Sequence, residues 1–241
     1  MAKISVCMAT YNGEQYINEQ IDSILAQLDT TDELIISDDH STDKTREIVN
    51  AYEDGRIKFI VNNGKPGFVC NFENALIQSS GDIIFLSDQD DVWLPNKIKE
   101  MIDFLKEGQY DVASCNCAQT DERLSIIKEE YYTGKNPINT GVLGNLVHPM
   151  WLGSCMAFTR KVLDEVLPFP KGIAAHDLWI GLWAQLHFRC GYYPKVLQYY
   201  RRHGGTASFA GKKSKNTLKR KLGYRFSMGR CLLKRTIERK L

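Results

Sequence analysis

Three carboxylates crowd into four consecutive positions of the chain, at Asp88, Asp90 and Asp91, with Gln89 between the first two. Carboxylates this close repel one another, and a bound cation relieves that repulsion. Mg²⁺ typically takes one or two protein carboxylates and completes its shell with substrate phosphates and water. The cluster therefore predicts a site for Mg²⁺ or Mn²⁺; the alternative is a solvated acidic turn that caps the following helix.

Two further polar segments stand directly after apolar runs, as the acidic cluster does. Thr10-Tyr11-Asn12 follows the apolar run at residues 3–9, and Asp38-Asp39 follows the run at 33–37. In an open parallel sheet, ligands bind beyond the carboxyl ends of the strands, so the three segments are expected at one rim. The chain carries no Gly-rich phosphate-binding loop, so a cation held by carboxylates is the expected means of binding phosphate.

Short apolar runs alternate with amphipathic stretches, and these supply the elements that would position the three segments. Strands are expected at residues 3–9, 33–37, 56–61, 82–86 and 111–114, and helices at 17–28, from about 44, at 68–78 and from Pro95. This order predicts an α/β fold with a mostly parallel central sheet and helices on both faces. We assign residues 1–114 to a nucleotide-binding half.

The pattern weakens after Ser114. Residues 115–140 are polar and irregular, and beyond them we expect a strand at 151–158, a helix at 176–187 and a strand at 192–200. We assign residues 115–210 to the acceptor half of one catalytic domain, 1–210. Tryptophans in this half can stack on sugar rings, although tryptophans at helical spacing more often belong to a core (Trp151, Trp179 and Trp183).

The composition is that of a soluble globular protein. Of the 241 residues, 43% are hydrophobic and 25% are charged, which excludes a disordered or collagenous chain. The seven cysteines are odd in number and form no C-x-x-C pair, which is typical of free thiols in a reducing compartment. No signal-peptide pattern and no apolar run of the ~20 residues needed for a membrane span is present, so we expect a cytoplasmic protein.

The C-terminal tail, residues 211–241, differs sharply from the rest in charge. It holds 12 Lys and Arg against one Glu, whereas the other 210 residues hold 19 bases against 28 acids. Its apolar residues step mostly by fours, which predicts a basic amphipathic helix (Leu218, Leu222, Phe226, Leu233, Ile237 and Leu241). Such a helix can lie on an anionic membrane, here through 212–241 at the inner face of the cell membrane. The alternative is docking on the acidic body or on a second subunit; nucleic acid is not the expected partner.

Taken together, the three rim segments resemble the motifs of family 2 glycosyltransferases of the GT-A fold. They read VCMATYN at 6–12, SDDHSTD at 37–43 and SDQDDVW at 87–93, where the family carries S-x-x-x-x-T-Y-N, V-D-D-x-S-x-D and D-x-D. The likeness covers roughly residues 3–205. The D-Q-D-D-V-W form, with His176-Asp177 and Tyr200-Arg201-Arg202-His203, is most similar to bacterial rhamnosyltransferases and related cell-surface polysaccharide enzymes.

The resemblance implies a role for each matching residue. A nucleotide-diphosphate sugar, UDP- or dTDP-linked, would be bound by a set of polar side chains (Thr10, Tyr11, Asn12, Asp38, Asp39, Asn71, Asp88 and Arg201). Either Asp38 or Asp39, with Asp39 preferred, would accept a hydrogen bond from the pyrimidine N3–H. The metal would be held at the acidic cluster, with a later histidine reaching it or the diphosphate (Asp90, Asp88, Asp91 and His203). A surface basic turn is the alternative for Arg201 and His203.

Asp177 matches the general base of the family, and His176 stands where the family usually has Glu. Direct displacement at the anomeric carbon needs one such base and charge neutralisation on the leaving diphosphate. The resemblance thus implies inverting transfer of a sugar, with rhamnose one candidate, to a glycan or lipid-linked acceptor in polysaccharide synthesis. A helix N-terminus would stabilise the charged form of Asp177, which could also merely cap that helix. The rival function is an inactive member that binds carbohydrate or lipid.

Overall fold

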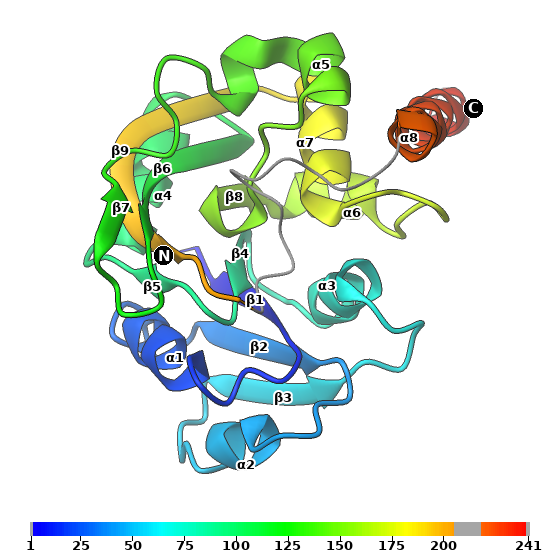
Figure 1. The fold of residues 1–241 in the computed structure, drawn as a ribbon. Coiled ribbons are helices and arrows are strands. Elements are labelled where there is room, and N and C mark those ends of the chain that lie inside the picture. The colour runs from blue at the N-terminus through cyan, green and yellow to red at the C-terminus, as the bar shows by residue number, and fades with distance from the viewer. Residues whose placement is uncertain (1, 205–217, 240–241) are drawn as a thin grey trace.

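A computed structural model of the chain describes residues 2–204 and 218–239 (Figure 1). The strands are β1 (Ile4–Thr10), β2 (Glu33–Asp38), β3 (Ile57–Val61), β4 (Ile83–Asp88), β5 (Val92–Trp93), β6 (Val112–Thr120), β7 (Ile126–Lys128), β8 (Met156–Thr159) and β9 (Cys190–Arg201). The helices are α1 (Ile17–Leu25), α2 (Thr45–Asn50), α3 (Phe68–Ile77), α4 (Lys97–Glu107), α5 (Pro137–Val147), the 3₁₀ turn η1 (Gly153–Cys155), α6 (Arg160–Val166), α7 (His176–His187) and α8 (Leu218–Arg239).

One sheet runs through the molecule in the order β3-β2-β1-β4-β8-β6-β9-β5, with β7 beside β6. Strands β3, β2, β1 and β4 are parallel, as the alternating pattern predicted, and β6 pairs in parallel with β9. Between these two groups β8 is antiparallel to both β4 and β6. The expected α/β fold with a mostly parallel sheet is confirmed.

The register of the parallel strands places the three polar segments next to one another. Thr10 is paired with Asp38 across β1 and β2, and Ala9 is paired with Asp88 across β1 and β4. The chain leaves all three strands at the same edge, where parallel strands present their carboxyl ends. The expectation of a shared polar rim is therefore confirmed.

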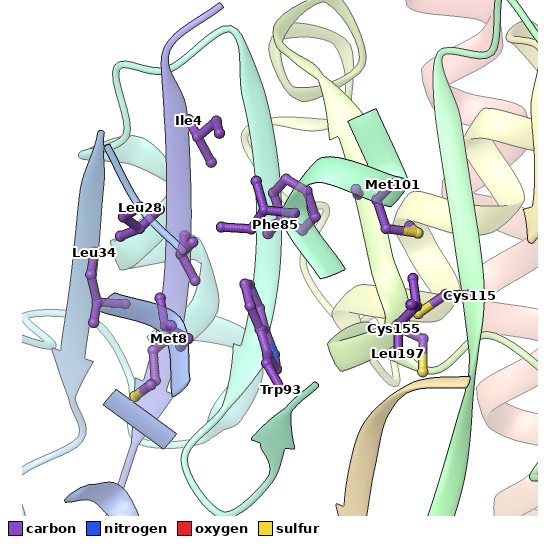
Figure 2. Close-up of a cluster of buried hydrophobic side chains, with 14 of the residues drawn as sticks. Ile4, Met8, Leu28, Leu34, Phe85, Trp93, Met101, Cys115, Cys155 and Leu197 are labelled. Atoms are coloured by element: carbon purple, nitrogen blue, oxygen red, sulfur yellow. The ribbon is translucent and has the colours of Figure 1, made fainter. Parts of the chain in front are cut away.

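Successive residues of β1 enter different cores on the two faces of the sheet. Val6 and Met8 pack in the cluster that includes α1 and α4, whereas Cys7 packs with α3 in the other cluster. Figure 2 shows the first cluster extending from Leu34 on β2 to Leu197 on β9. Because β6 also continues to Thr120, across the boundary expected at residue 114, the two halves share one sheet and both core clusters.

The region expected to be irregular, residues 115–140, was predicted wrongly. It contains the rest of β6, the strand β7 and the start of α5. The N-terminus of α5 has a capping box, in which the side chains of Asn136 and Asn139 each accept from the other's backbone N–H. Its apolar residues do not fall on one face, and Gly141 breaks it with a φ of 67°, so periodicity gave no signal for this helix.

Other elements of this half follow the expectations more closely. The helix expected at 176–187 is α7, with those bounds. Of the strand expected at 151–158 only β8 forms, after the turn η1. The tryptophans of this half are buried in the core, which confirms the packing alternative for them (Trp151, Trp179 and Trp183).

The C-terminal helix α8 is docked on the body of the protein, which confirms the docking alternative for the tail (Figure 1). Met228 and Leu232 are buried against the second core cluster, and Arg235 donates to the carbonyl oxygen of Pro168 at 2.5 Å. Residues 205–217, Leu241 and the side chains of Leu218 and Leu222 lie outside the described part of the chain. Within that part, no helix combines the length and the hydropathy needed to cross a membrane.

Candidate active site

Gln89 joins the loop after β1 to the acidic turn after β4. Its Oε1 accepts hydrogen bonds from Thr10 Oγ1 at 2.5 Å and from Tyr11 N at 2.8 Å, and its Nε2 donates to Tyr11 O at 3.0 Å. Gly13 makes this contact possible, because a Cβ at that position would lie 2.3 Å from Gln89 Oε1. The ring of Tyr11 is 56% exposed and is therefore free to stack on a ligand ring at this rim.

The two neighbouring aspartates after β2 have different surroundings. Asp38 is buried, and both of its oxygens accept from Ser41, one from the backbone N and one from Oγ. Asp39 is only half-buried; its oxygens accept from Asn62 Nδ2 and from Gly67 N, each at 2.7 Å. Asp38 thus holds its own turn together, and Asp39 is the less buried of the two residues.

Asn12 and Asn71 secure this rim from two sides. Asn12 Oδ1 accepts from Thr42 N at 2.8 Å, which ties the first loop to the second. Asn71 is buried; its Nδ2 donates to Thr10 O at 3.0 Å and its Oδ1 accepts from Ser37 Oγ at 2.6 Å. The amide of Asn71 thus bonds the ends of β1 and β2 and supports them, and its contact with the donor stays a prediction.

The acidic turn holds two carboxylates on the ligand side. Asp90 Oδ2 lies 2.7 Å from His203 Nε2, and the His203 ring packs against Tyr16 with 4.5 Å between ring centroids. At Asp88, burial and the nearby charges of Asp90 and Asp177 raise the pKa to about 7. Asp88, Asp90 and His203 are thus grouped at the end of β4, as the sequence predicted.

Asp91 differs from the other two carboxylates of the turn in that it has no exposed surface. It is fully buried, and its oxygens accept from Arg201 N and from Gln198 Nε2, each at 3.1 Å. Burial and the charges of Asp90 and Asp88 raise its pKa well above the ordinary value. Asp91 therefore supports the turn through these hydrogen bonds, and its expected role as a metal ligand stays a prediction.

Arg201 also supports the acidic turn. Its side chain is 3% exposed and donates to Asp90 O at 2.9 Å, to Glu122 O at 2.8 Å and to the carboxylate of Glu19. The alternative of a surface basic turn is therefore wrong for Arg201, whereas its contact to the diphosphate stays a prediction. A guanidinium that binds two backbone carbonyls and a carboxylate fixes β9 to the acidic turn.

Asp177 lies in the first turn of α7, where its oxygens accept from Leu178 N at 2.7 Å and from Gly153 N at 3.2 Å. The N-cap of α7 is Ala175, and no side chain caps it, so the cap alternative for Asp177 is wrong. Burial raises the pKa of Asp177 to about 6, although its backbone hydrogen bonds oppose the shift. The expectation that the helix N-terminus would dominate is corrected: loss of water outweighs it.

His176 is a packing residue beside this carboxylate. It is buried, and its ring stacks on Phe72 with 3.8 Å between centroids. Burial lowers the pKa of His176 to about 3, so the imidazole is neutral at physiological pH. Where the resemblance led us to expect a second carboxylate, this chain therefore has an uncharged ring beside the single carboxylate of Asp177.

The residues on the ligand side of the turn fit a divalent cation that shares its shell with a diphosphate. Among the residues that the structure describes, no three His, Cys, Asp or Glu are arranged to hold a metal by themselves. Asp90 and His203 place one carboxylate and one imidazole 2.7 Å apart, and the raised pKa of Asp88 marks a site that a cation would relieve. Mg²⁺ commonly takes one or two carboxylates and draws the remaining ligands from phosphates and water.

With this geometry established, comparison with protein families is decisive. The model of the family described as "Glycosyl transferase family 2" matches residues 5–167, which contain all three rim segments. The chain belongs to glycosyltransferase family 2.

Curated members of glycosyltransferase family 2 are similar over much of the chain. The UDP-Glc:alpha-D-GlcNAc-diphosphoundecaprenol beta-1,3-glucosyltransferase WfaP of Escherichia coli is 29% identical over 218 residues, 86% of this chain and 80% of WfaP. The GalNAc(5)-diNAcBac-PP-undecaprenol beta-1,3-glucosyltransferase of Campylobacter jejuni is 29% identical over 93% of this chain and 72% of its own length. The match to E. coli WfgD, 33% identical, covers 47% of each chain.

Solved structures of this family's fold superpose well. TarS of S. aureus in complex with UDP-GlcNAc gives a TM-score of 0.67 at 24% identity, over 85% of this chain and 60% of TarS. The mannosyltransferase PcManGT of Pyrobaculum calidifontis, in complex with GDP-Man and Mn²⁺, gives 0.60 at 20% identity, over 83% of this chain and 56% of that one. These neighbours confirm the GT-A fold for this family 2 chain.

Several residues that shape the site of this glycosyltransferase carry no signal in the sequence. Gln89 binds both sides of the rim, Glu19 receives Arg201, and Gly153 donates to Asp177. Each of these contacts joins positions far apart in the chain, so no local pattern marks them. The D-Q-D-D string does place Gln89 at the rim, but it does not indicate that Gln89 bonds Thr10 and Tyr11.

Proposed function

We propose that the chain is an inverting glycosyltransferase in which Asp177 removes the proton of the acceptor hydroxyl. One observation carries the proposal: Asp177 is a buried carboxylate with a pKa of about 6, within electrostatic reach of Asp88 at the donor rim. Such a carboxylate is ionised at neutral pH, yet it is a stronger base than an exposed aspartate. A single carboxylate is enough for direct displacement here, because a diphosphate leaving group does not need the second carboxylate with which hydrolases protonate theirs.

The donor is proposed to be a nucleotide-diphosphate sugar whose base stacks on Tyr11 and whose N3–H donates to Asp39. A pyrimidine nucleotide, UDP or dTDP, meets both requirements. Asp90 and His203 would hold Mg²⁺ or Mn²⁺ next to the diphosphate, with Asp88 beside them. The ion would supply charge neutralisation for the departing diphosphate. The named activities of the relatives favour glucose as the sugar, and rhamnose stays a candidate from the sequence motifs.

The acceptor is proposed to be a lipid-linked glycan in bacterial polysaccharide synthesis. WfaP and the C. jejuni relative are both named for acceptors linked to undecaprenol through a diphosphate, and these two align with most of this chain. An enzyme with such an acceptor works at a membrane surface, because the lipid remains in the bilayer.

The outer face of α8 suits contact with that surface. Three apolar side chains on one face of the helix are exposed, Phe226 to 76%, Leu233 to 65% and Ile237 to 53%. Arg230 and Lys234 are exposed along the same side, where they can meet anionic headgroups. The opposite stripe, which includes Met228, is docked on the body, so α8 is apolar on both faces. We propose peripheral membrane contact through the outer face.

A donor screen with a transfer step tests the proposed function. Thermal shifts are measured with UDP-glucose, UDP-GlcNAc, dTDP-rhamnose and GDP-mannose, each with and without Mn²⁺; a ligand at 100 times its Kd adds about 2.7 kcal/mol. The Asp90→Ala variant is expected to lose the part of the shift that needs Mn²⁺. The donor that binds is then incubated with polyprenyl-diphosphate GlcNAc, and a product heavier by one sugar is expected. Binding without transfer to this or other glycolipids would favour the inactive scaffold.

A further inference from the structure

A lysine is completely buried at the start of α4, directly behind the acidic turn. Lys97 has no exposed surface, and burial lowers its pKa. Lysines are almost never buried in this way unless they are paired. Its surroundings therefore have to hold the ammonium group through specific contacts.

Those contacts lead to two different elements beside the candidate active site, a 3₁₀ turn and a strand. The Nζ of Lys97 donates to Ser154 O at 2.7 Å and to Gln198 Oε1, and it lies 4.0 Å from the centre of the Trp93 ring. Ser154 belongs to the turn η1, and Gln198 belongs to β9. Three residues from distant parts of the chain thus converge on one buried cation.

Gln198 links Lys97 to the acidic turn. Its Nε2 donates to Asp91 Oδ2 at 3.1 Å and to Ser154 Oγ at 2.8 Å. An amide side chain can turn over and exchange its oxygen with its nitrogen. Because Lys97 is a donor only, it fixes the oxygen of Gln198 on its own side and directs the nitrogen to the carboxylate of Asp91.

The turn that contains Ser154 links Lys97 to the proposed base, Asp177. The preceding residue, Gly153, donates its backbone N–H to Asp177 Oδ2 at 3.2 Å. The space around this peptide is tight, since a Cβ at Gly153 would lie 2.9 Å from His176 Nε2. A shift of η1 would therefore move the hydrogen-bond donor of Asp177.

We propose that Lys97 is a positioning residue that fixes the acidic turn and the base Asp177 relative to each other. One arm runs through Gln198 to Asp91 and the metal-side carboxylates; the other runs through Ser154 and Gly153 to Asp177. Lys97 itself contacts neither substrate nor reacting atoms. The catalytic consequence rests on the proposed function, whereas the positioning itself does not.

Hydrogen exchange and kinetics on Lys97→Met test the proposal. Methionine keeps the length and apolar stem of lysine and removes the donor. The control is Lys99→Met on the same helix, because Lys99 is exposed and its ion pair is with Asp103, one turn further along α4. In Lys97→Met, exchange in segments 89–93 and 152–155 is expected to be at least about tenfold faster, and in Lys99→Met unchanged. Unchanged exchange in either segment of Lys97→Met would overturn the coupling, whether or not transfer is ever detected.

The kinetic readout separates positioning from simple loss of stability. In Lys97→Met, kcat is expected to fall by roughly 10²-fold while the Kd for UDP without metal stays within about threefold, since a small misplacement costs rate more than binding. Equal losses in kcat and in metal-free UDP affinity would contradict a positioning role. If Lys97→Met does not fold, Gln198→Leu breaks one arm and leaves the bond from Lys97 to Ser154. Faster exchange at 89–93 is then expected, and unchanged exchange there would overturn the proposal.

Discussion

Asp38 and Asp39 show how neighbouring residues of one type take on different tasks. In the turn that follows β2, both carboxylate oxygens of Asp38 accept hydrogen bonds from Ser41, one from its backbone N and one from its hydroxyl. Asp39 is less buried than Asp38 and lies at the rim. The sequence motif contains both residues and favours Asp39 as the partner of the pyrimidine; the difference in burial is consistent with that prediction.

The first prediction compares these two residues. Asp39→Ala is expected to weaken UDP binding by about 1–3 kcal/mol, because a hydrogen bond to a charged acceptor is lost. Asp38→Ala is the matched control; it is expected to lower the melting temperature, since Ser41 loses its acceptor, with a smaller effect on UDP. Isothermal titration and thermal melts measure both. If UDP affinity falls in Asp38→Ala and holds in Asp39→Ala, the assignment is reversed.

The second prediction follows from the raised pKa of Asp177. A carboxylate is charged above its pKa and neutral below it, and here burial places that pKa at about 6. The rate of transfer should therefore be level above about pH 7 and fall as the pH drops through 6, by about tenfold per pH unit well below it. Initial rates over this range measure the acidic limb. A rate that stays level down to pH 5 would exclude Asp177 as the titrating base.

At the scale of elements, the first half of the fold was readable and much of the second half was not. Strands β1, β2 and β4 are continuous apolar runs that end in polar loops, which is how buried parallel strands appear in a sequence. Helix α5 has no apolar face of its own, and β8 is a short strand that begins only after η1. These two elements are stabilised by tertiary contacts, and local pattern does not report such contacts.

The tail helix α8 was predicted from local pattern, but its stability depends on tertiary contacts. Gly223 and Gly229 lower the helix propensity of this segment, yet α8 runs unbroken from Leu218 to Arg239. Contacts made by the inner stripe of α8 offset this cost, including the buried Met228 and the bond from Arg239 to Glu165 at 3.0 Å. The outer stripe has no such contacts within the described chain, and its apolar residues are exposed.

The third prediction concerns this outer stripe. A triple variant, Phe226→Ser, Leu233→Ser and Ile237→Ser, is expected to reduce binding to phosphatidylglycerol vesicles at least about tenfold, because apolar insertion is lost while the cations remain. The matched control is Ile127→Ser on β7, a similarly exposed isoleucine on another element. Co-sedimentation measures both, with phosphatidylcholine vesicles for comparison. Equal vesicle binding by the triple variant would rule out the membrane face, and loss of a dimer instead would assign it to a second subunit.

At the scale of the whole molecule, one sheet and one pair of cores serve both the donor and the acceptor sides. Residues 1–210 carry a net charge of −9 and residues 211–241 one of +11, and this asymmetry was visible in the sequence. The contacts that connect the donor side to the acceptor side were not visible in the sequence. Lys97 and Gln198 are 101 positions apart, and their contact exists only because β9 returns beside the acidic turn. The motifs located the chemistry, and long-range contacts, which no motif encodes, set its geometry.

The central claim is that Asp177 is the base of an inverting transfer, and the Asp177→Asn variant tests it most directly. Asparagine keeps the shape and removes the proton acceptor. Asp164→Asn, an exposed aspartate on α6, is the matched control. At pH 7.5 and saturating donor, the rate of Asp177→Asn is expected to fall by about 10²–10⁴ relative to wild type, with UDP affinity unchanged and the wild-type product inverted by NMR. A rate for Asp177→Asn within a few-fold of the wild type and of Asp164→Asn would contradict the account.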